Sequence, residues 1–255
     1  TELRYGEASL QALDFYPADA RSPLIVFVHG GGWKRGDKGN ATGTTKIAHF
    51  REKGYAFATI NYRLVPQATV EQQASDVASA VAALRRDAGT LGFDPKRIVL
   101  MGHSAGAHLV ALVGTDPQYL KAAGLDLPAI AGVIPLDGAA YDVPAQMKDG
   151  PGIMQPTYAQ AFGSDPARQR ALSPTWQAAA PNAPAFLILH VDREDGARQS
   201  EALAAALRKA GTRVEIRGFE GKGLAGHMAI NRRLGDPDYP ATPVVDAWLE
   251  ALFRP

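Results

Sequence analysis

The sequence of 255 residues contains no cysteine. Disulfide frameworks, thiol nucleophiles, thiolate zinc sites and iron–sulfur clusters all need that side chain. Any catalysis must therefore use oxygen and nitrogen side chains, and we expect neither a metal nor another cofactor. Because cysteine usage gives no guide, the redox compartment stays open.

The chain also lacks an excess of either charge, since it has 27 basic and 26 acidic residues and a formal net charge of +1. No basic run is longer than Arg85-Arg86 or Arg232-Arg233. Proteins that bind nucleic acid or acidic membranes usually carry a basic patch or stripe. We expect neither of these partners.

Long hydrophobic runs are missing as well. No stretch reaches the roughly 18 apolar residues that a membrane-spanning helix needs, so we expect no membrane insertion. The chain begins at Thr1 without a charged and then apolar leader, which fits a cytoplasmic protein and equally a periplasmic or secreted one whose signal peptide was removed. The composition, 46% hydrophobic and 21% charged, is typical of a soluble globular protein and compatible with a homo-oligomer.

Short apolar runs alternate with helical patterns along the chain. The runs predict strands at residues 10–16, 23–29, 55–62, 97–101, 132–136, 184–190 and 213–217. Helical spacing predicts helices at residues 70–84 and 199–210, the second ending at Gly211, and a last helix with Thr242 as its N-cap and Pro243 as its first residue. This alternation predicts one α/β domain over residues 1–255, with a mostly parallel sheet and helices on both faces.

Residues 138–182 break the regular pattern, because they are rich in proline and carry scattered apolar side chains. A structureless loop of this length inside a compact domain is usually functional. We expect a small lid or pocket wall inserted between two strands, with a surface loop as the alternative.

The segment Gly102-His103-Ser104-Ala105-Gly106 stands between a predicted strand and a helix-compatible segment. In the pattern Gly-x-Ser-x-Gly the serine occupies a strained turn, and the glycines prevent collisions with the neighbouring elements. Its hydroxyl is then exposed at the carboxyl end of the strand. This placement indicates that Ser104 is a nucleophile.

The segment His29-Gly30-Gly31-Gly32-Trp33 directly follows the predicted buried strand at residues 23–29. A loop without side chains can turn its backbone amides toward the oxyanion of an acyl-transfer reaction. We expect donors at Gly31 and Gly32, with Ala105 supplying a third amide. A phosphate-binding loop is the alternative, but the chain has neither Gly-x-Gly-x-x-Gly nor Gly-Lys-Ser/Thr here.

A serine nucleophile needs a histidine base, and the base needs an acid that fixes its tautomer. In sites of this type on an α/β sheet the order along the chain is serine, acid, histidine. His227 alone lies beyond the carboxylates that follow the strand at residues 184–190, in a glycine-rich segment expected to be a flexible loop. His29 is expected to hold the glycine loop by hydrogen bonds, and His103 and His108 to be packing residues.

The acid is the least determined member of this set. Asp192, Glu194 and Asp195 all follow the same predicted strand. We prefer Asp192, because Asp195 is explained as the N-cap of the next helix and Glu194 as a solvent-facing side chain. Asp137, at the end of the preceding strand, is an outside candidate.

Several segments together resemble the α/β-hydrolase superfamily, in particular small bacterial esterases with a His-Gly-Gly-Gly-Trp loop. These include relatives of hormone-sensitive lipase, of feruloyl and acetylxylan esterases, and of arylformamidases. The segments are residues 29–38, 61–66, 92–98, 102–106, Gln199-Ser200, His227 and 231–235. The chain departs from the pattern at residues 191–196, and the 28 residues before His29 are too few for the helical cap of hormone-sensitive-lipase relatives.

The resemblance implies a serine esterase with Ser104 as nucleophile, His227 as base and Asp192 as acid, requiring no cofactor. We expect small-molecule esters with short or aromatic groups as substrates. The alternative within the same machinery is an arylformamidase that cleaves N-formylkynurenine. A different alternative, a binding protein without catalysis on the same scaffold, is disfavoured because serine and histidine are both present.

Overall fold

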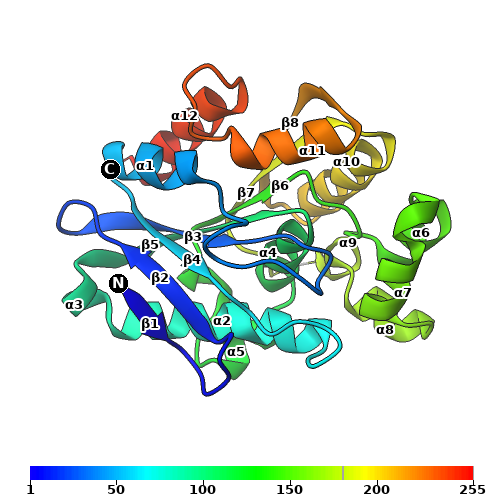
Figure 1. Ribbon diagram of the computed structural model, residues 1–255, viewed down its shortest axis with the longest axis horizontal. Coiled ribbons are helices and arrows are strands. Elements are labelled where there is room, and N and C mark those ends of the chain that lie inside the picture. Colours follow the sequence, from blue (N-terminus) through cyan, green and yellow to red (C-terminus); the bar gives the residue numbers. More distant parts are fainter. Residues whose placement is uncertain (180, 255) are drawn as a thin grey trace.

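The computed structural model describes residues 1–179 and 181–254. Its centre is one eight-stranded sheet with the strand order β1-β2-β4-β3-β5-β6-β7-β8 (Figure 1). The strands are β1 (Glu2–Arg4), β2 (Ala12–Tyr16), β3 (Ser22–Val28), β4 (Ala56–Ile60), β5 (Phe93–His103), β6 (Gly132–Leu136), β7 (Ala185–Asp192) and β8 (Arg213–Lys222). All seven predicted strands are present.

The six strands from β4 to β8 in this order run parallel, and β1 and β2 add an antiparallel edge. The predicted mostly parallel sheet is confirmed. Parallel strands end at the same edge of a sheet, and open α/β sheets bind their ligands there. The segments that follow β3, β5, β6 and β7 therefore approach one another.

Helices cover both faces of the sheet (Figure 1). The longer ones are α1 (Thr44–Glu52), α2 (Val70–Arg86), α4 (Ala105–Thr115), α10 (Glu194–Lys209), α11 (Gly223–Arg232) and α12 (Ala241–Phe253), and two short ones are α3 (Ala88–Leu91) and α5 (Gln118–Ala122). One buried cluster joins α2, α4 and α10 to one face, and a second joins α1, α11 and α12 to the other. Within the described residues, no helix has the length and apolar character required to cross a bilayer.

The segment at residues 138–182 is largely helical. It contains α6 (Val143–Asp149), α7 (Gln155–Phe162), α8 (Pro166–Ala171) and α9 (Pro174–Gln177), with one 3₁₀ turn at Gly152–Met154. It lies between β6 and β7 in the chain, and α6, α7 and α8 project at one end of the molecule (Figure 1). We call residues 138–182 the insertion.

Two predicted helix starts are wrong. The last helix begins at Ala241, so Thr242 is inside it, and the Thr242 hydroxyl accepts a hydrogen bond from the Gly235 amide instead of capping the helix. The helix predicted from residue 199 begins at Glu194, because β7 leads into it through Arg193 alone. Its predicted end holds, since Gly211 adopts a φ of 81° just beyond it.

Candidate active site

Ser104 sits in the sharp turn between β5 and α4. Its φ of 58° and ψ of −120° are a strained conformation for a residue with a side chain. The flanking glycines are required by contact: a Cβ on Gly102 would lie 2.2 Å from the Gly106 carbonyl oxygen, and one on Gly106 would lie 2.0 Å from that of Val28. The predicted turn is confirmed, together with the reason for its glycines.

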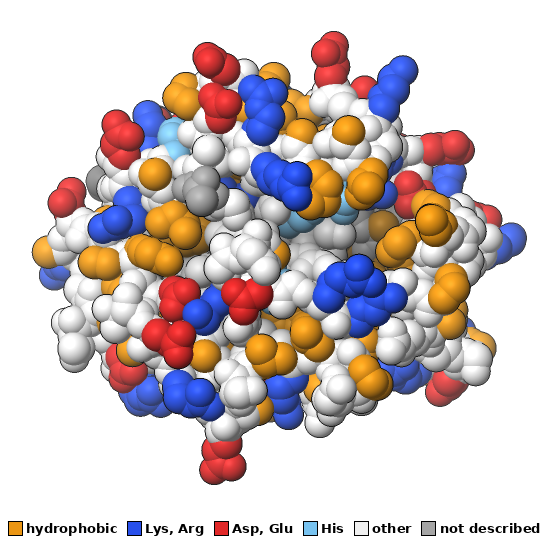
Figure 2. Space-filling model, viewed as in Figure 1, with side chains coloured by type: hydrophobic (Ala, Val, Ile, Leu, Met, Phe, Trp, Pro, Cys, Tyr) orange, Lys and Arg blue, Asp and Glu red, His pale blue; other side chains and the backbone are white. Residues whose placement is uncertain are grey.

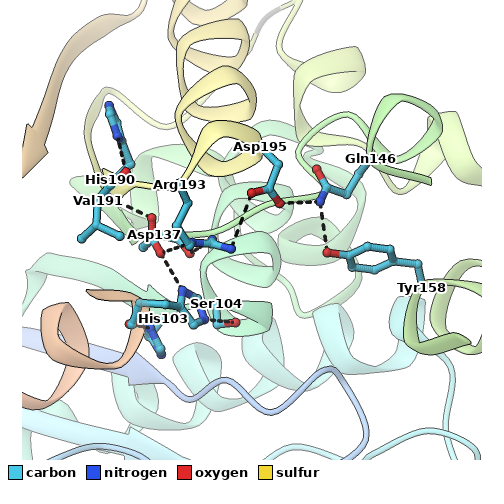
Figure 3. A network of polar contacts seen from close by, with 10 residues as sticks. His103, Ser104, Asp137, Gln146, Tyr158, His190, Val191, Arg193 and Asp195 are labelled. Carbon is cyan, nitrogen blue, oxygen red and sulfur yellow. Dashed lines mark hydrogen bonds and ion pairs between the residues drawn. The ribbon is translucent and has the colours of Figure 1, made fainter. Parts of the chain in front are cut away.

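The Ser104 hydroxyl lies against His227, with 2.9 Å between Oγ and Nε2. The other ring nitrogen, Nδ1, donates to Oδ2 of Asp137 at 2.6 Å. Serine, imidazole and carboxylate thus form one continuous hydrogen-bonded line, part of which is drawn in Figure 3. In this arrangement the imidazole can take a proton from the hydroxyl while the carboxylate stabilises the imidazolium.

His227 comes from a helix, although the sequence predicted a flexible loop. It lies in α11, and its backbone oxygen accepts a hydrogen bond from Nε2 of His103 at 2.7 Å. The glycines that suggested a loop instead allow two backbone segments to lie close together, because a Cβ on Gly226 would lie 2.3 Å from the carbonyl carbon of Gly221. The base is therefore held by a rigid element.

The expectation that Asp192 contacts His227 is wrong. Asp192 is exposed at the end of β7, where a register shift between Val191 and Asp192 interrupts the pairing with β8. The carboxylate that reaches His227 is that of Asp137, the outside candidate, which directly follows β6 with a φ of 45°.

Asp195 does not contact His227 in this geometry either. It is also not the N-cap of α10, since it lies in the first turn of that helix and accepts a hydrogen bond from Gln146. Glu194 is exposed, as expected.

The Asp137 carboxylate is buried and fully engaged. Oδ1 accepts from the Val191 amide at 3.0 Å, and Oδ2 accepts from Nε of Arg193 at 2.8 Å as well as from His227. Burial by itself would raise the pKa of Asp137, but the hydrogen bond from His227 and the charge of Arg193 outweigh it and lower the pKa to about 2. Asp137 is therefore an anion at neutral pH.

The predicted oxyanion loop lies directly beside the serine. A Cβ on Gly30 would lie 2.9 Å from the Cβ of Ser104, and Gly31 and Gly32 adopt φ values of 127° and 62°. Within the described residues, the amides of Gly31, Gly32 and Ala105 donate to no protein acceptor. Ala105 is the first residue of α4, so its amide is one of the free donors at a helix N-terminus.

Several side chains that the sequence did not single out hold this loop. Gln73 donates to the Trp33 oxygen at 2.7 Å, and the Tyr62 hydroxyl donates to the His29 oxygen at 2.7 Å. His29 is buried, and its Nδ1 donates to the Gly30 oxygen at 2.7 Å, in agreement with the predicted role. Burial lowers the pKa of His29, so the ring is a neutral structural donor. The resemblance included residues 61–66 but gave Tyr62 no role.

His103 and His108 are buried, as expected of packing residues, but both also position the site. His108 accepts from the Trp33 indole at 3.2 Å and donates to the Leu172 oxygen at 2.8 Å, which joins the loop to the insertion. Burial lowers the pKa of His108 to about 4. Burial, and then the charge of His227, hold the pKa of His103 well below its ordinary value. Both rings therefore act as neutral hydrogen-bonding groups.

The insertion contacts the oxyanion loop. The ring of Trp33 meets that of Phe162 edge to face with 4.9 Å between centroids, and Nζ of Lys34 lies 3.3 Å from the Thr157 hydroxyl. Figure 2 shows a hollow in the surface, with histidine side chains inside it and hydrophobic and basic side chains around its rim. Among residues 1–179 and 181–254, no group of three or more histidine, aspartate or glutamate side chains is placed to hold a metal ion.

Residues 13–207 match the family model of BD-FAE. The chain belongs to the BD-FAE family. A probable isoprenylcysteine alpha-carbonyl methylesterase of Oryza sativa subsp. japonica is 39% identical over 110 residues, which are 42% of this chain and 26% of that protein. The chain thus spans about a quarter of the length of the methylesterases it matches.

One curated relative and one solved structure each match nearly the whole chain. Kynurenine formamidase of Danio rerio is 28% identical over 250 residues, which are 96% of this chain and 80% of that protein. The solved structure of the butyrate-bound esterase Est2 of Thermogutta terrifontis covers 99% of this chain and 94% of its own, with a TM-score of 0.79 and 24% identity. The chain has the α/β-hydrolase fold.

Proposed function

We propose that this protein is a serine carboxylic-ester hydrolase that forms an acyl-enzyme on Ser104. The observation that carries the proposal is the unbroken line from the Ser104 hydroxyl through His227 to Asp137, with distances of 2.9 Å and 2.6 Å. Asp137 takes the place of the acid that the sequence assigned to Asp192. The family and the esterases among the relatives support the reaction class.

In the first half of the reaction, Oγ of Ser104 attacks the ester carbonyl while Nε2 of His227 takes the hydroxyl proton. The developing oxyanion is stabilised by the free amides of Gly31, Gly32 and Ala105, each worth about 100- to 1000-fold in rate. The tetrahedral intermediate then collapses. The bond to the alcohol oxygen breaks, and His227 gives its proton to the leaving alcohol.

Water completes the cycle. His227 takes one proton from a water molecule whose oxygen attacks the acyl carbon, and the same amides stabilise the second oxyanion. The bond to Oγ breaks, the proton returns to Ser104, and the carboxylic acid leaves. Asp137 remains an anion throughout and holds Nδ1 of His227 in its protonated form.

For the substrate we propose a short or aromatic ester with uncharged acyl and alcohol groups. Tyr158 and Phe162 of the insertion pack as buried side chains against Trp33 of the oxyanion loop, and the apolar Leu224, one turn before His227 on α11, has 75% of its surface exposed. In this proposal the insertion acts as the pocket wall. The butyrate found in the related Est2 structure is consistent with a short acyl group.

The test is hydrolysis of p-nitrophenyl acetate, butyrate and octanoate by the wild type and by Ser104→Ala at matched concentration. We expect activity on the shorter esters and a loss of at least about 1000-fold in the variant. A wild type that turns over none of these esters, or a variant as active as the wild type, would contradict the proposal.

An arylformamidase is the second candidate, because kynurenine formamidase of Danio rerio matches 96% of this chain. The same residues would cleave a formamide, with the formyl group on Ser104. Comparing kcat/KM for N-formylkynurenine and p-nitrophenyl acetate separates the two, and a value at least 100-fold higher for the formamide would assign the protein to this second reaction.

A further inference from the structure

Arg193 contacts the same carboxylate oxygen of Asp137 as His227 does. Its Nε donates to Oδ2 of Asp137 at 2.8 Å, and its Nη2 donates to the Asp137 backbone oxygen at 3.2 Å. Oδ2 therefore receives two donors, from His227 and from a guanidinium whose side chain is 18% exposed. Two contacts from one planar group fix both the position and the orientation of the carboxylate.

Arg193 is itself held through the insertion. Its Nη1 lies 3.8 Å from Oδ1 of Asp195, whose Oδ2 accepts from Nε2 of Gln146 at 2.9 Å. The Gln146 amide also reaches the Tyr158 hydroxyl at 3.0 Å. Figure 3 shows this chain of contacts running from Asp137 to α6 and α7.

The chain of contacts returns to the oxyanion loop, because the Tyr158 ring lies 6.2 Å from that of Trp33, edge to face. The carboxylate that orients the base and the loop that would bind the oxyanion are thus both held through α7. Arg198, also on α10, forms an ion pair of a different kind, because it pairs with the exposed Glu194 at 3.3 Å at the surface.

We propose that Arg193 is a positioning residue that orients Asp137 for His227 and tunes, by its charge, the pH at which the pair takes up a proton. This inference rests on the proposed function. A positive charge within about 4–6 Å opposes protonation of its neighbours. Without Arg193, the pair of Asp137 and His227 would bind a proton at higher pH, and the acid limb of kcat/KM would move upward.

The other titratable groups near Asp137 and Arg193 set the size of this effect. Near Asp137 they are His103 from β5, which stays neutral, the buried Tyr141 just after β6, and Tyr239, which precedes α12. Near Arg193 it is Asp195, whose negative charge balances part of that of the guanidinium. The buried Lys46 acts on His103 from α1. Because Asp195 is the acidic group that contacts Arg193 from α10, its removal should act in the opposite direction to removal of Arg193.

The experiment compares Arg193→Gln, Arg193→Lys and Asp195→Asn with wild type and with the control Arg198→Gln, using p-nitrophenyl acetate from about pH 5 to pH 9. We expect Arg193→Gln to lose about 10- to 100-fold in kcat/KM and to move the acid limb up by on the order of one pH unit. Arg193→Lys should also lose rate but keep the acid limb of the wild type, because it retains the charge. Asp195→Asn should move the limb to lower pH, and Arg198→Gln should change neither.

Each outcome has one meaning. An inactive wild type contradicts the proposed function. An active wild type with unshifted limbs in both Arg193→Gln and Asp195→Asn overturns the inference about Arg193 and leaves the proposed function standing. If Arg193→Gln fails to fold, Arg193→Lys and Asp195→Asn still decide, since a purely structural role predicts no shift of the limb in either direction for Asp195→Asn.

Discussion

His227 and Asp137 are 90 residues apart in the sequence, and Nδ1 of the histidine lies 2.6 Å from Oδ2 of the aspartate. Asp137 follows β6 directly, whereas Asp192, which the sequence favoured, is the last residue of β7. The two strands are parallel neighbours, so both loops emerge at the same edge of the sheet. The acid of the site has thus been supplied by the adjacent strand.

The first prediction distinguishes Asp137, after β6, from Asp192, at the end of β7. Asp137→Asn should lower kcat on p-nitrophenyl acetate by about 10⁴-fold, because the imidazole then loses its fixed tautomer and the anion that stabilises its charged form. Asp192→Asn should keep activity within about threefold of wild type, since its side chain is exposed and the structure gives it no contact with His227. Initial rates at equal concentrations of folded protein measure both. A large loss in Asp192→Asn with a mild one in Asp137→Asn would contradict the structural assignment.

The sequence could not place the acid because the decisive features are not local patterns. An aspartate stands at the carboxyl end of both β6 and β7. Asp137 reaches His227 because its backbone has a left-handed φ of 45° and because hydrogen bonds from Arg193 and the Val191 amide stabilise its carboxylate in a buried position. What excludes Asp192 is a register shift against β8.

Ser104 and the sheet could be predicted well, because their signals are physical and local. Continuous apolar runs give buried parallel strands, and Gly102 and Gly106 are needed where backbones touch. Gly226 is also needed where backbones touch, but the sequence predicted a flexible loop there. A glycine required for close packing and a glycine in a flexible loop cannot be told apart in a sequence. Arg193 gave no signal at all, because its partner lies 56 residues away.

The second prediction concerns acid stability. The pKa of Asp137 is about 2 in the folded protein against an ordinary value of 3.8, so the ionised carboxylate stabilises the fold above about pH 4 and this contribution is lost as the pH falls toward 2. The expected size is about 2 kcal/mol. Denaturant unfolding of wild type and Asp137→Asn at several pH values should show their difference shrinking over this window. A difference that stays constant with pH would argue against the ionised state.

The third prediction concerns Lys46, which is fully buried on α1. Its Nζ donates to the Thr42 oxygen, the Asn231 oxygen and Oδ1 of Asn231, and burial lowers the pKa of Lys46 to about 7. An unfolded chain keeps this proton to about pH 10.4, so unfolding takes up a proton and stability rises with pH above 7. The free energy of unfolding of wild type relative to Lys46→Met should rise by about 1.4 kcal/mol per unit between about pH 8 and pH 10. Equal slopes for the two proteins would refute it.

The fourth prediction uses two glycines in helices. Gly106→Ala should destabilise the protein by about 3 kcal/mol or more, because the new Cβ would meet the Val28 oxygen at 2.0 Å. Gly89→Ala, in α3, meets nothing within 4 Å and should leave stability unchanged or raise it by up to about 1 kcal/mol. Thermal unfolding midpoints of the two variants measure the contrast, and similar midpoints would show that the turn around Ser104 is not closely packed.

Whether Ser104 is an activated nucleophile can be read from covalent labelling with a fluorophosphonate, followed by intact mass and peptide mapping. An activated serine should take up one phosphonyl group per chain, with fluoride leaving and the new bond on Oγ of Ser104. Ser104→Ala should remain unlabelled, and Asp137→Asn should be labelled far more slowly than Asp192→Asn. No adduct on the wild type, or an adduct on another serine that persists in Ser104→Ala, would contradict the assignment of Ser104 as the nucleophile.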